Sequence, residues 1–106
     1  MTSEKTLKKV LLSPKAKLRE ALELLGNSPF NIIFTVGSRG EVTGCVTDGD
    51  IRRAFLRGET LDSEVNKVVR NNFISAAAGT AKSKIKNLLV KNGIRQIPLL
   101  DAEGRL

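Results

Sequence analysis

The chain of 106 residues contains no histidine, tryptophan or tyrosine, and its single cysteine is Cys45. The absence of histidine excludes histidine-based acid–base catalysis and most zinc sites. One cysteine cannot form an internal disulfide, and its place inside an apolar segment predicts a buried, inert thiol in a reducing compartment. We therefore expect a cytoplasmic domain with no catalytic residues and no metal site.

Aromatic residues and long apolar runs are also scarce. With four phenylalanines as the whole aromatic content, stacking platforms for single-stranded nucleic acid are largely missing. The apolar runs fall far short of the roughly 20 residues that a membrane span requires. The start of the chain, Met1–Lys5, also lacks the apolar stretch of a signal peptide. The sequence therefore predicts neither membrane association nor secretion.

Basic residues outnumber acidic ones by eighteen to eleven, which gives a formal net charge of +7. Such a charge is compatible with a nucleic acid or another polyanion as partner. The lysines and arginines are dispersed, however, and on the expected helices most occupy solvent-facing positions. We favour a solvated basic surface over nucleic-acid binding, and a basic rim around a phosphate site is compatible with the same pattern.

The chain aligns with itself when it is shifted by 64 positions, so that Ile33 meets Ile97 and Gly40 meets Gly104. A repeat of this length is one supersecondary unit whose open face is covered by its copy. We predict a first unit at 1–58, a connector at 59–70 and a second unit at 71–106. The predicted fold class is α+β, with tandem β-α-β-β-α units.

Local signals predict the elements of the first unit. They are a strand at 10–12, a helix that starts at Ser13 and Pro14 and ends at Gly26, a strand at 31–36, a turn at 37–40, a strand at 42–46, and a helix from Thr47 to Gly58.

The connector is expected to pack as a turn or short helix against the second unit. That unit should contain a strand at 73–75, a helix from about Thr80 to Asn92 with its stop at Gly93, a strand at 95–100 and a turn at 101–104. The chain then stops before copies of the last strand and helix. The second unit is therefore predicted to be incomplete, as in a piece of a longer protein or a chain that ends early.

The segment 44–53 carries most of the functional information. It is an apolar strand that ends in the hydroxyl of Thr47, followed by Asp48, Gly49 and Asp50 and then by a basic helix. A helix N-terminus attracts phosphate, and a carboxylate can accept both hydroxyls of a ribose. Thr47 and Asp50 also fit a capping box that needs no ligand, and both roles stay open. Two adjacent carboxylates without a third ligand make a poor metal site.

This segment resembles the signature of cystathionine-β-synthase (CBS) domains, in which glycine and two apolar residues precede threonine or serine and, three positions later, aspartate. The matching residues here are Gly44, Cys45, Val46, Thr47 and Asp50. The resemblance extends over the whole chain, as one complete CBS motif and part of a second. It implies a regulatory module, not an enzyme, whose ligand is an adenosine nucleotide (AMP, ADP or ATP) or S-adenosylmethionine.

The resemblance also assigns binding roles. Asp50 would hold the ribose hydroxyls, Thr47 the ribose or the phosphate, and the backbone of residues 44–46 would line the cleft. Ile33 would flank the base, and Arg95 would reach a phosphate from the second unit. Because a single ribose motif is present, a symmetric pair of nucleotides within one chain is not expected.

A narrower resemblance concerns residues 46–54, which are similar to CBS modules fused to sugar-phosphate enzymes. These are sugar-1-phosphate nucleotidyltransferases, with an N-terminal pair, and sugar-phosphate isomerases, with a C-terminal pair. If Met1 is the native start, the first group fits, and a catalytic domain would follow Leu106. Exposed strand edges and apolar faces of the incomplete unit further predict a homodimer. The alternative function is a homodimerisation or interaction module without a specific ligand.

Overall fold

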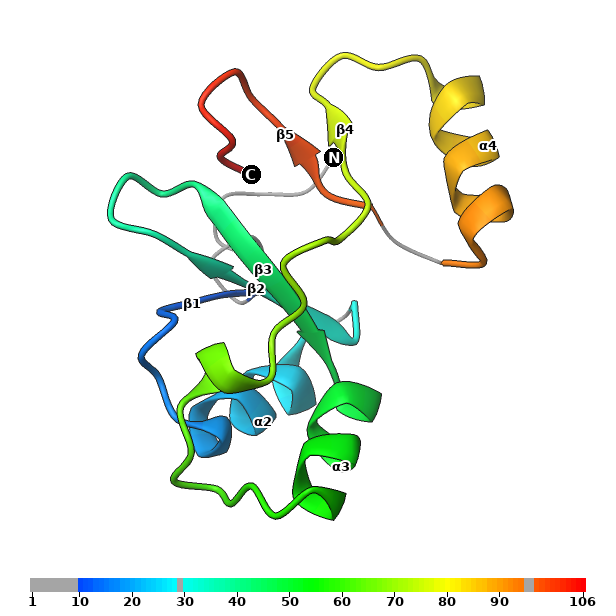
Figure 1. Ribbon diagram of the computed structural model, residues 1–106. Helices are drawn as coiled ribbons and strands as arrows, with labels where there is room; N and C mark the ends of the chain where they lie inside the picture. Colours follow the sequence, from blue (N-terminus) through cyan, green and yellow to red (C-terminus); the bar gives the residue numbers. More distant parts are fainter. Residues whose placement is uncertain (1–9, 29, 95–96) are drawn as a thin grey trace.

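The computed structural model describes residues 10–28, 30–94 and 97–106. The elements in chain order are β1 (Leu11–Leu12), α2 (Leu18–Asn27), β2 (Ile32–Val36), β3 (Val42–Thr47), α3 (Asp48–Leu56), the 3-10 helix η1 (Val65–Lys67), β4 (Ala76–Ala77), α4 (Lys82–Asn92) and β5 (Leu99–Leu100). They form a three-stranded sheet in the order β1-β2-β3 and a two-stranded sheet, β4-β5. Figure 1 shows α2 and α3 on one side of the larger sheet, and β4, β5 and α4 on the other. The predicted α+β class is confirmed.

The larger sheet is built around a hairpin. β2 and β3 run antiparallel with Phe34 opposite Cys45, and β1 adds to β2 in parallel. The turn between β2 and β3 closes through a hydrogen bond from the Gly37 N–H to the Glu41 carbonyl, at 2.9 Å. Gly40 has φ +81° there, a conformation that glycine adopts without steric cost. The strands and the turn that the sequence predicted are confirmed, with bounds shifted by one residue.

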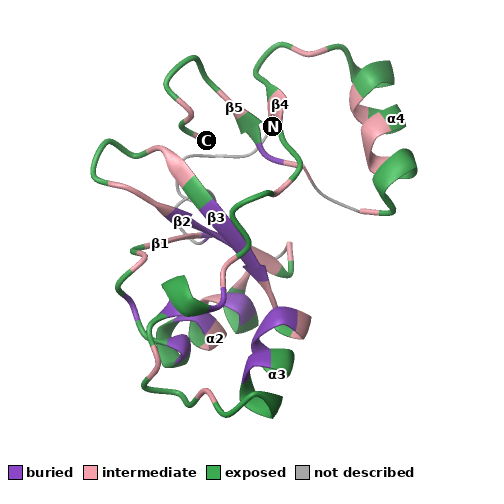
Figure 2. Ribbon diagram, in the orientation of Figure 1, coloured by how far each residue is buried: buried purple, intermediate pink, exposed green. Residues whose placement is uncertain are grey.

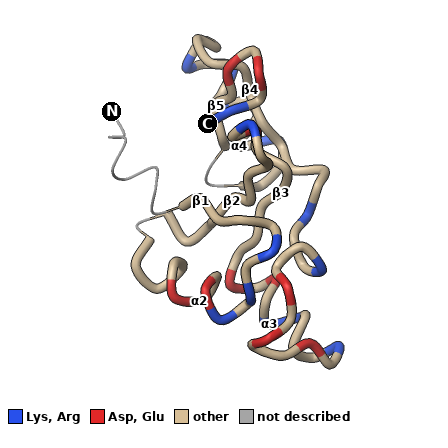
Figure 3. Tube along the Cα trace, turned by 90° about the vertical axis from the view of Figure 1, so that its left-hand side faces the viewer, with Lys and Arg blue, Asp and Glu red and all other residues tan. Residues whose placement is uncertain are grey.

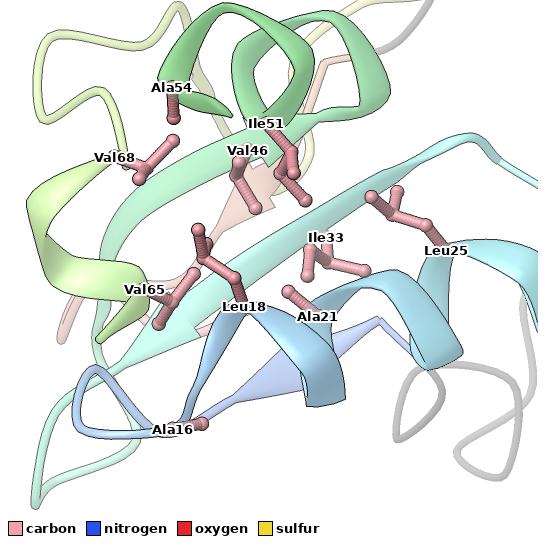
Figure 4. Close-up of a cluster of buried hydrophobic side chains, with 10 residues drawn as sticks. All are labelled: Ala16, Leu18, Ala21, Leu25, Ile33, Val46, Ile51, Ala54, Val65 and Val68. Carbon is pink, nitrogen blue, oxygen red and sulfur yellow. The ribbon is translucent and has the colours of Figure 1, made fainter. Parts of the chain in front are cut away.

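The main core fills the space between the larger sheet and helices α2 and α3 (Figure 4). Its buried residues are Ala16, Leu18, Ala21, Leu25, Ile33, Val46, Ile51, Ala54, Val65 and Val68. Burying one such aliphatic side chain stabilises a fold by about 1.5–3 kcal/mol. The opposite face of the same sheet carries a smaller cluster of Val10, Phe34 and Cys45. Because side chains alternate along a strand, neighbouring residues of β2 and β3 serve different clusters.

Two predicted bounds of the first helix are wrong. Residues 13–16 form a turn, closed by a hydrogen bond of 3.0 Å from the Ala16 N–H to the Ser13 carbonyl, and α2 begins at Leu18. Lys17 is extended and bridges to Glu64, so tertiary pairing overrides the local helix-start signal. Gly26 does not end the helix either, since α2 continues to Asn27.

The connector packs against the first unit, not the second as expected. The side chain of Val65 is 0% exposed inside the main core. Its N–H donates to the Ala16 carbonyl at 2.7 Å, and the N–H groups of Leu18 and Arg19 donate to the carbonyls of Ser63 and Leu61. The N–H groups in the first turn of any helix have no partners within the helix. For α2, carbonyl groups of the connector accept the hydrogen bonds from two of these N–H groups.

The second unit repeats the first in register. Leu12 pairs with Thr35 in the larger sheet, and the residues 64 positions later, Ala76 and Leu99, pair in the smaller one. Gly104 has φ +79°, close to that of its counterpart Gly40. The helix prediction for this unit is confirmed as α4, which ends at Gly93 in a left-handed conformation.

The strands of the second unit differ from their predicted ranges. Its first strand is Ala76–Ala77, not 73–75, while its last is Leu99–Leu100, and the predicted range 95–100 falls partly outside the described residues. Helix α4 has no fully buried residue. Figure 2 accordingly shows the buried segments concentrated in the larger sheet, α2 and α3. The second unit therefore contributes little to the buried core.

Gly44 offers a test of how closely the connector approaches β3. An added Cβ would lie 3.1 Å from Val69 side-chain atoms and 3.2 Å from the Arg70 carbonyl oxygen. We expect Gly44→Ala to lower the free energy of unfolding in urea by about 1–3 kcal/mol. The matched control is Gly26→Ala, where nothing lies within 4 Å of the added atom. Because Gly26 is helical, its replacement should stabilise the protein by about 0.5–1 kcal/mol. Equal effects of the two substitutions would contradict this packing.

Candidate functional site

The junction of β3 and α3 forms a capping box. Thr47 is extended, and its Oγ1 accepts a hydrogen bond of 3.4 Å from the Asp50 N–H. In return, Asp50 Oδ2 accepts from the Thr47 N–H at 2.9 Å and from the Thr47 hydroxyl at 3.0 Å. The arrangement satisfies donors at the start of the helix and fixes both side chains. The capping role that the sequence left open is therefore present without a ligand.

The same Asp50 carboxylate also contacts two arginines. Its Oδ1 lies 2.7 Å from Arg53 Nη2, and its Oδ2 lies 3.3 Å from Arg70 Nε. The Asp50 side chain is 6% exposed, while those of Arg53 and Arg70 are 63% and 55% exposed. A buried carboxylate is tolerated when it is paired and hydrogen-bonded in this way. Asp50 therefore joins the start of α3 to the end of the connector.

A cleft lies beside this cluster, on the face of the larger sheet away from α2 and α3. Its volume is about 110 Å³, and its lining residues are Ile32, Phe34, Cys45, Arg70, Asn72, Phe73, Ile74, Ile94 and Pro98. The rings of Phe34 and Phe73 meet edge to face, with centroids 6.4 Å apart. Small-molecule sites commonly enclose about 300–1,000 Å³, so this cleft fits one part of a nucleotide, such as its base.

The structure separates the candidate site residues into two groups. Cys45 lines the cleft, next to Arg70 and near Thr47 and Asp50. Burial raises the pKa of the Cys45 thiol, and the nearby Arg70 guanidinium partly offsets this rise. The thiol is thus buried and mainly protonated at neutral pH, as the sequence suggested.

The side chains of Ile33 and Val46 lie elsewhere. Both are 0% exposed in the core beneath α2 and α3, so the Ile33 side chain does not line the cleft, and its expected contact with a base stays a prediction. Consecutive side chains of a strand point to opposite faces of the sheet. The neighbours of Ile33 in β2, Ile32 and Phe34, therefore line the cleft instead. Gly44 is packed against Val69 and Arg70. Arg95 lies outside the described residues.

Sequence reasoning missed Arg70, Asn72 and Phe73 as lining residues. Alternation along β2 places Phe34 on the cleft side only once Ile33 is known to lie in the core, and the family resemblance had instead suggested Ile33 beside the ligand. For Arg70 the sequence carries no comparable signal, since its position follows from the pairing of the connector with Cys45.

Charge and composition add little else to the site. Figure 3 shows lysines and arginines spread along the trace with aspartates and glutamates between them. Within the described ranges, no helix is long and apolar enough to cross a bilayer. The same ranges hold no group of three or more His, Cys, Asp or Glu residues that could bind a metal ion.

The β-α-β-β-α unit with its Thr47–Asp50 cap defines a known class of module. Residues 6–57 match the family model described as CBS domain. This match confirms the resemblance to CBS domains for residues 6–57, which make up the first motif.

A curated relative is the arabinose 5-phosphate isomerase GutQ of Salmonella typhi, 29% identical over 87 residues, which are 82% of this chain and 27% of the relative. The chain thus spans little more than a quarter of the length of this protein. The relatives give no support for the narrower resemblance to nucleotidyltransferases.

Two solved structures share the fold over nearly the whole chain. One is a CBS domain protein from Pyrobaculum aerophilum complexed with AMP, with a TM-score of 0.80, 18% identity, and coverage of 95% of this chain and 82% of that one. The other is the CBS domain pair of protein MJ0100 in complex with 5′-methylthioadenosine and S-adenosyl-L-methionine, with a TM-score of 0.79, 20% identity, and coverage of 92% and 79%. At these identities the likeness shows the fold, that of a CBS domain pair.

Asp50 should contribute more to stability than its neighbour Asp48. Asp50→Ala removes the capping box and both arginine contacts, so we expect the free energy of unfolding to fall by about 2–3 kcal/mol. The control Asp48→Ala removes an exposed carboxylate in the same turn. This substitution should lower the free energy of unfolding by less than about 1 kcal/mol. Chemical denaturation of both variants measures the difference. Similar stabilities would show that the Asp50 network contributes little to the fold.

Proposed function

We propose that the chain is a regulatory module that binds an adenosine nucleotide in the cleft and modulates an attached enzyme. The observation that carries this proposal is the position of the cleft. Arg70 lines the cleft and contacts Asp50 of the Thr47–Asp50 cap, so a ligand in the apolar cleft lies close to the carboxylate.

The lining suggests an orientation for the ligand. The base packs among Phe34, Phe73 and Ile74, which form the apolar wall, and the ribose lies toward Thr47 and Asp50. The backbone of residues 44–46 forms one edge of the site. Arg95 remains a proposed phosphate contact from the second unit, by the family resemblance. The boundaries 1–58, 59–70 and 71–106 likewise remain a proposed division into motifs.

The neighbours support a ligand of this class. The Pyrobaculum aerophilum protein is complexed with AMP, and the MJ0100 pair holds 5′-methylthioadenosine and S-adenosyl-L-methionine. We carry this class of ligand to the present chain. For the attached enzyme we propose one that acts on a sugar phosphate. The curated relative favours an isomerase over the nucleotidyltransferase that the sequence suggested.

A second candidate function is homodimerisation without a specific ligand. Leu56 at the end of α3 and Val90 on α4 are 84% and 74% exposed, and helix α4 buries none of its residues fully. Apolar side chains exposed on helices favour association with a second copy. A homodimer by itself is compatible with nucleotide binding. The second candidate function differs in that the module dimerises and its cleft binds no specific ligand.

Calorimetric titration of the chain with AMP, ADP, ATP and S-adenosylmethionine tests the proposal, with thiol labelling as a site-specific readout. Cys45 is the single cysteine and is 3% exposed, so its modification requires local opening at the cleft, which a ligand bound there would oppose. We expect binding of at least one ligand and slower labelling of Cys45 in its presence.

The control places the cysteine on an exposed position of α4, by combining Cys45→Ala with Ser83→Cys. The bound ligand should leave labelling of that cysteine unchanged. A chain that forms stable dimers but binds none of the four ligands would favour the interaction module instead. Binding that leaves Cys45 labelling unchanged would place the ligand outside the cleft.

A further inference from the structure

Helix α4 carries a concentration of positive charge that the other helices lack. Among its eleven residues none is acidic, and four are lysines: Lys82, Lys84, Lys86 and Lys91. Helices α2 and α3 each contain two acidic residues. Within the described part of the chain, none of the four lysines forms an ion pair, whereas Arg19 of α2 and Arg53 of α3 each pair with an aspartate. Helix α4 therefore adds four uncompensated charges to the surface.

The lysines lie on the exposed side of α4. By their spacing, its partly buried residues share the opposite side, and they are Ile85, Leu88 and Leu89. The four lysines are all exposed. Lys82, Lys86 and Val90 follow one another at four-residue intervals and so form a row along the helix, in which Val90 is 74% exposed. Figure 2 shows no buried segment along α4. Its outer face is thus basic, with one exposed apolar side chain.

The chemistry of this face favours a lipid surface as partner. A lysine ammonium is a hydrated point charge on a flexible stem, which suits a plane of anionic headgroups. Helix α4 has no arginine to pair with phosphate in two parallel hydrogen bonds and no aromatic ring to stack on a base. Both features are common in nucleic-acid sites. Lysine is also depleted at protein–protein interfaces.

We propose that the outer face of α4 docks on a membrane surface rich in anionic lipids. The lysines lie beside the headgroups, and Val90 makes a shallow apolar contact between them. A helix that lies on a bilayer needs no membrane-spanning segment. The contact departs from the sequence-based expectation of no membrane association, which rested on spanning segments and a signal peptide. It is separate from the proposed nucleotide site, because no residue of α4 lines the cleft.

Co-sedimentation with lipid vesicles tests this contact. We expect the chain to bind vesicles of phosphatidylcholine and phosphatidylglycerol in a two-to-one ratio, but not vesicles of phosphatidylcholine alone. A lysine near an anionic surface contributes about fivefold to the affinity. The double variant Lys82→Gln, Lys86→Gln should therefore bind the mixed vesicles about 25-fold more weakly than wild type. Binding of wild type should also weaken as sodium chloride is raised, because salt screens exposed charges.

The control variant removes the same charge from another helix. Arg52→Gln combined with Arg57→Gln changes two exposed positions on α3 and at its end, on the other side of the larger sheet from α4 (Figure 1). Charges beyond a Debye length of a surface are largely screened, so this variant should bind the mixed vesicles as wild type does.

An equal loss of vesicle binding in the α3 and α4 variants would overturn the proposal, because it would show attraction by the net charge alone. Failure of wild type to bind the mixed vesicles would overturn it as well. So would tighter binding to a DNA duplex at the same salt that is lost in the α4 variant, which would assign the face to nucleic acid. None of these results bears on nucleotide binding in the cleft, which the calorimetric titration measures separately.

Discussion

The buried carboxylate of Asp50 is the interaction on which the rest of the structure depends. It closes the cap that starts α3, and it holds the arginine at the end of the connector. Two guanidinium groups face this single carboxylate, so the cluster keeps an excess of positive charge even when fully paired. Such a site can accept an anion without burying an unpaired charge. The same residues that stabilise the fold thus keep positive charge beside the cleft.

The connector gives this cluster a route to the second unit. Through Val65 it is anchored in the core of the first unit, and through Arg70 it pairs with β3 before the chain continues toward β4. Helix α4 of that unit has no fully buried residue, whereas α2 and α3 each bury three.

The sequence predicted features that depend on local chemistry. Thr47 and Asp50 form the expected cap because three-residue spacing brings a hydroxyl and a carboxylate to the same helix end. The repeat also holds, down to the pairing register of the two sheets. What failed depends on contacts between distant segments. The helix-start signal of Ser13 lost to pairing between Lys17 and Glu64, and nothing near Arg70 in the chain indicates its pairing with Cys45.

Gly44 and Ile33 show that residues expected at the ligand site also serve the fold. Gly44 lacks a side chain where Val69 and the Arg70 backbone approach β3, so it serves the packing of the connector as well as any ligand. Ile33 belongs to the core, while its neighbour Phe34 lines the cleft. Changes at signature positions therefore alter folding and binding together. Arg70 also serves the fold, because its backbone pairs with Cys45 and its guanidinium contacts the buried carboxylate of Asp50.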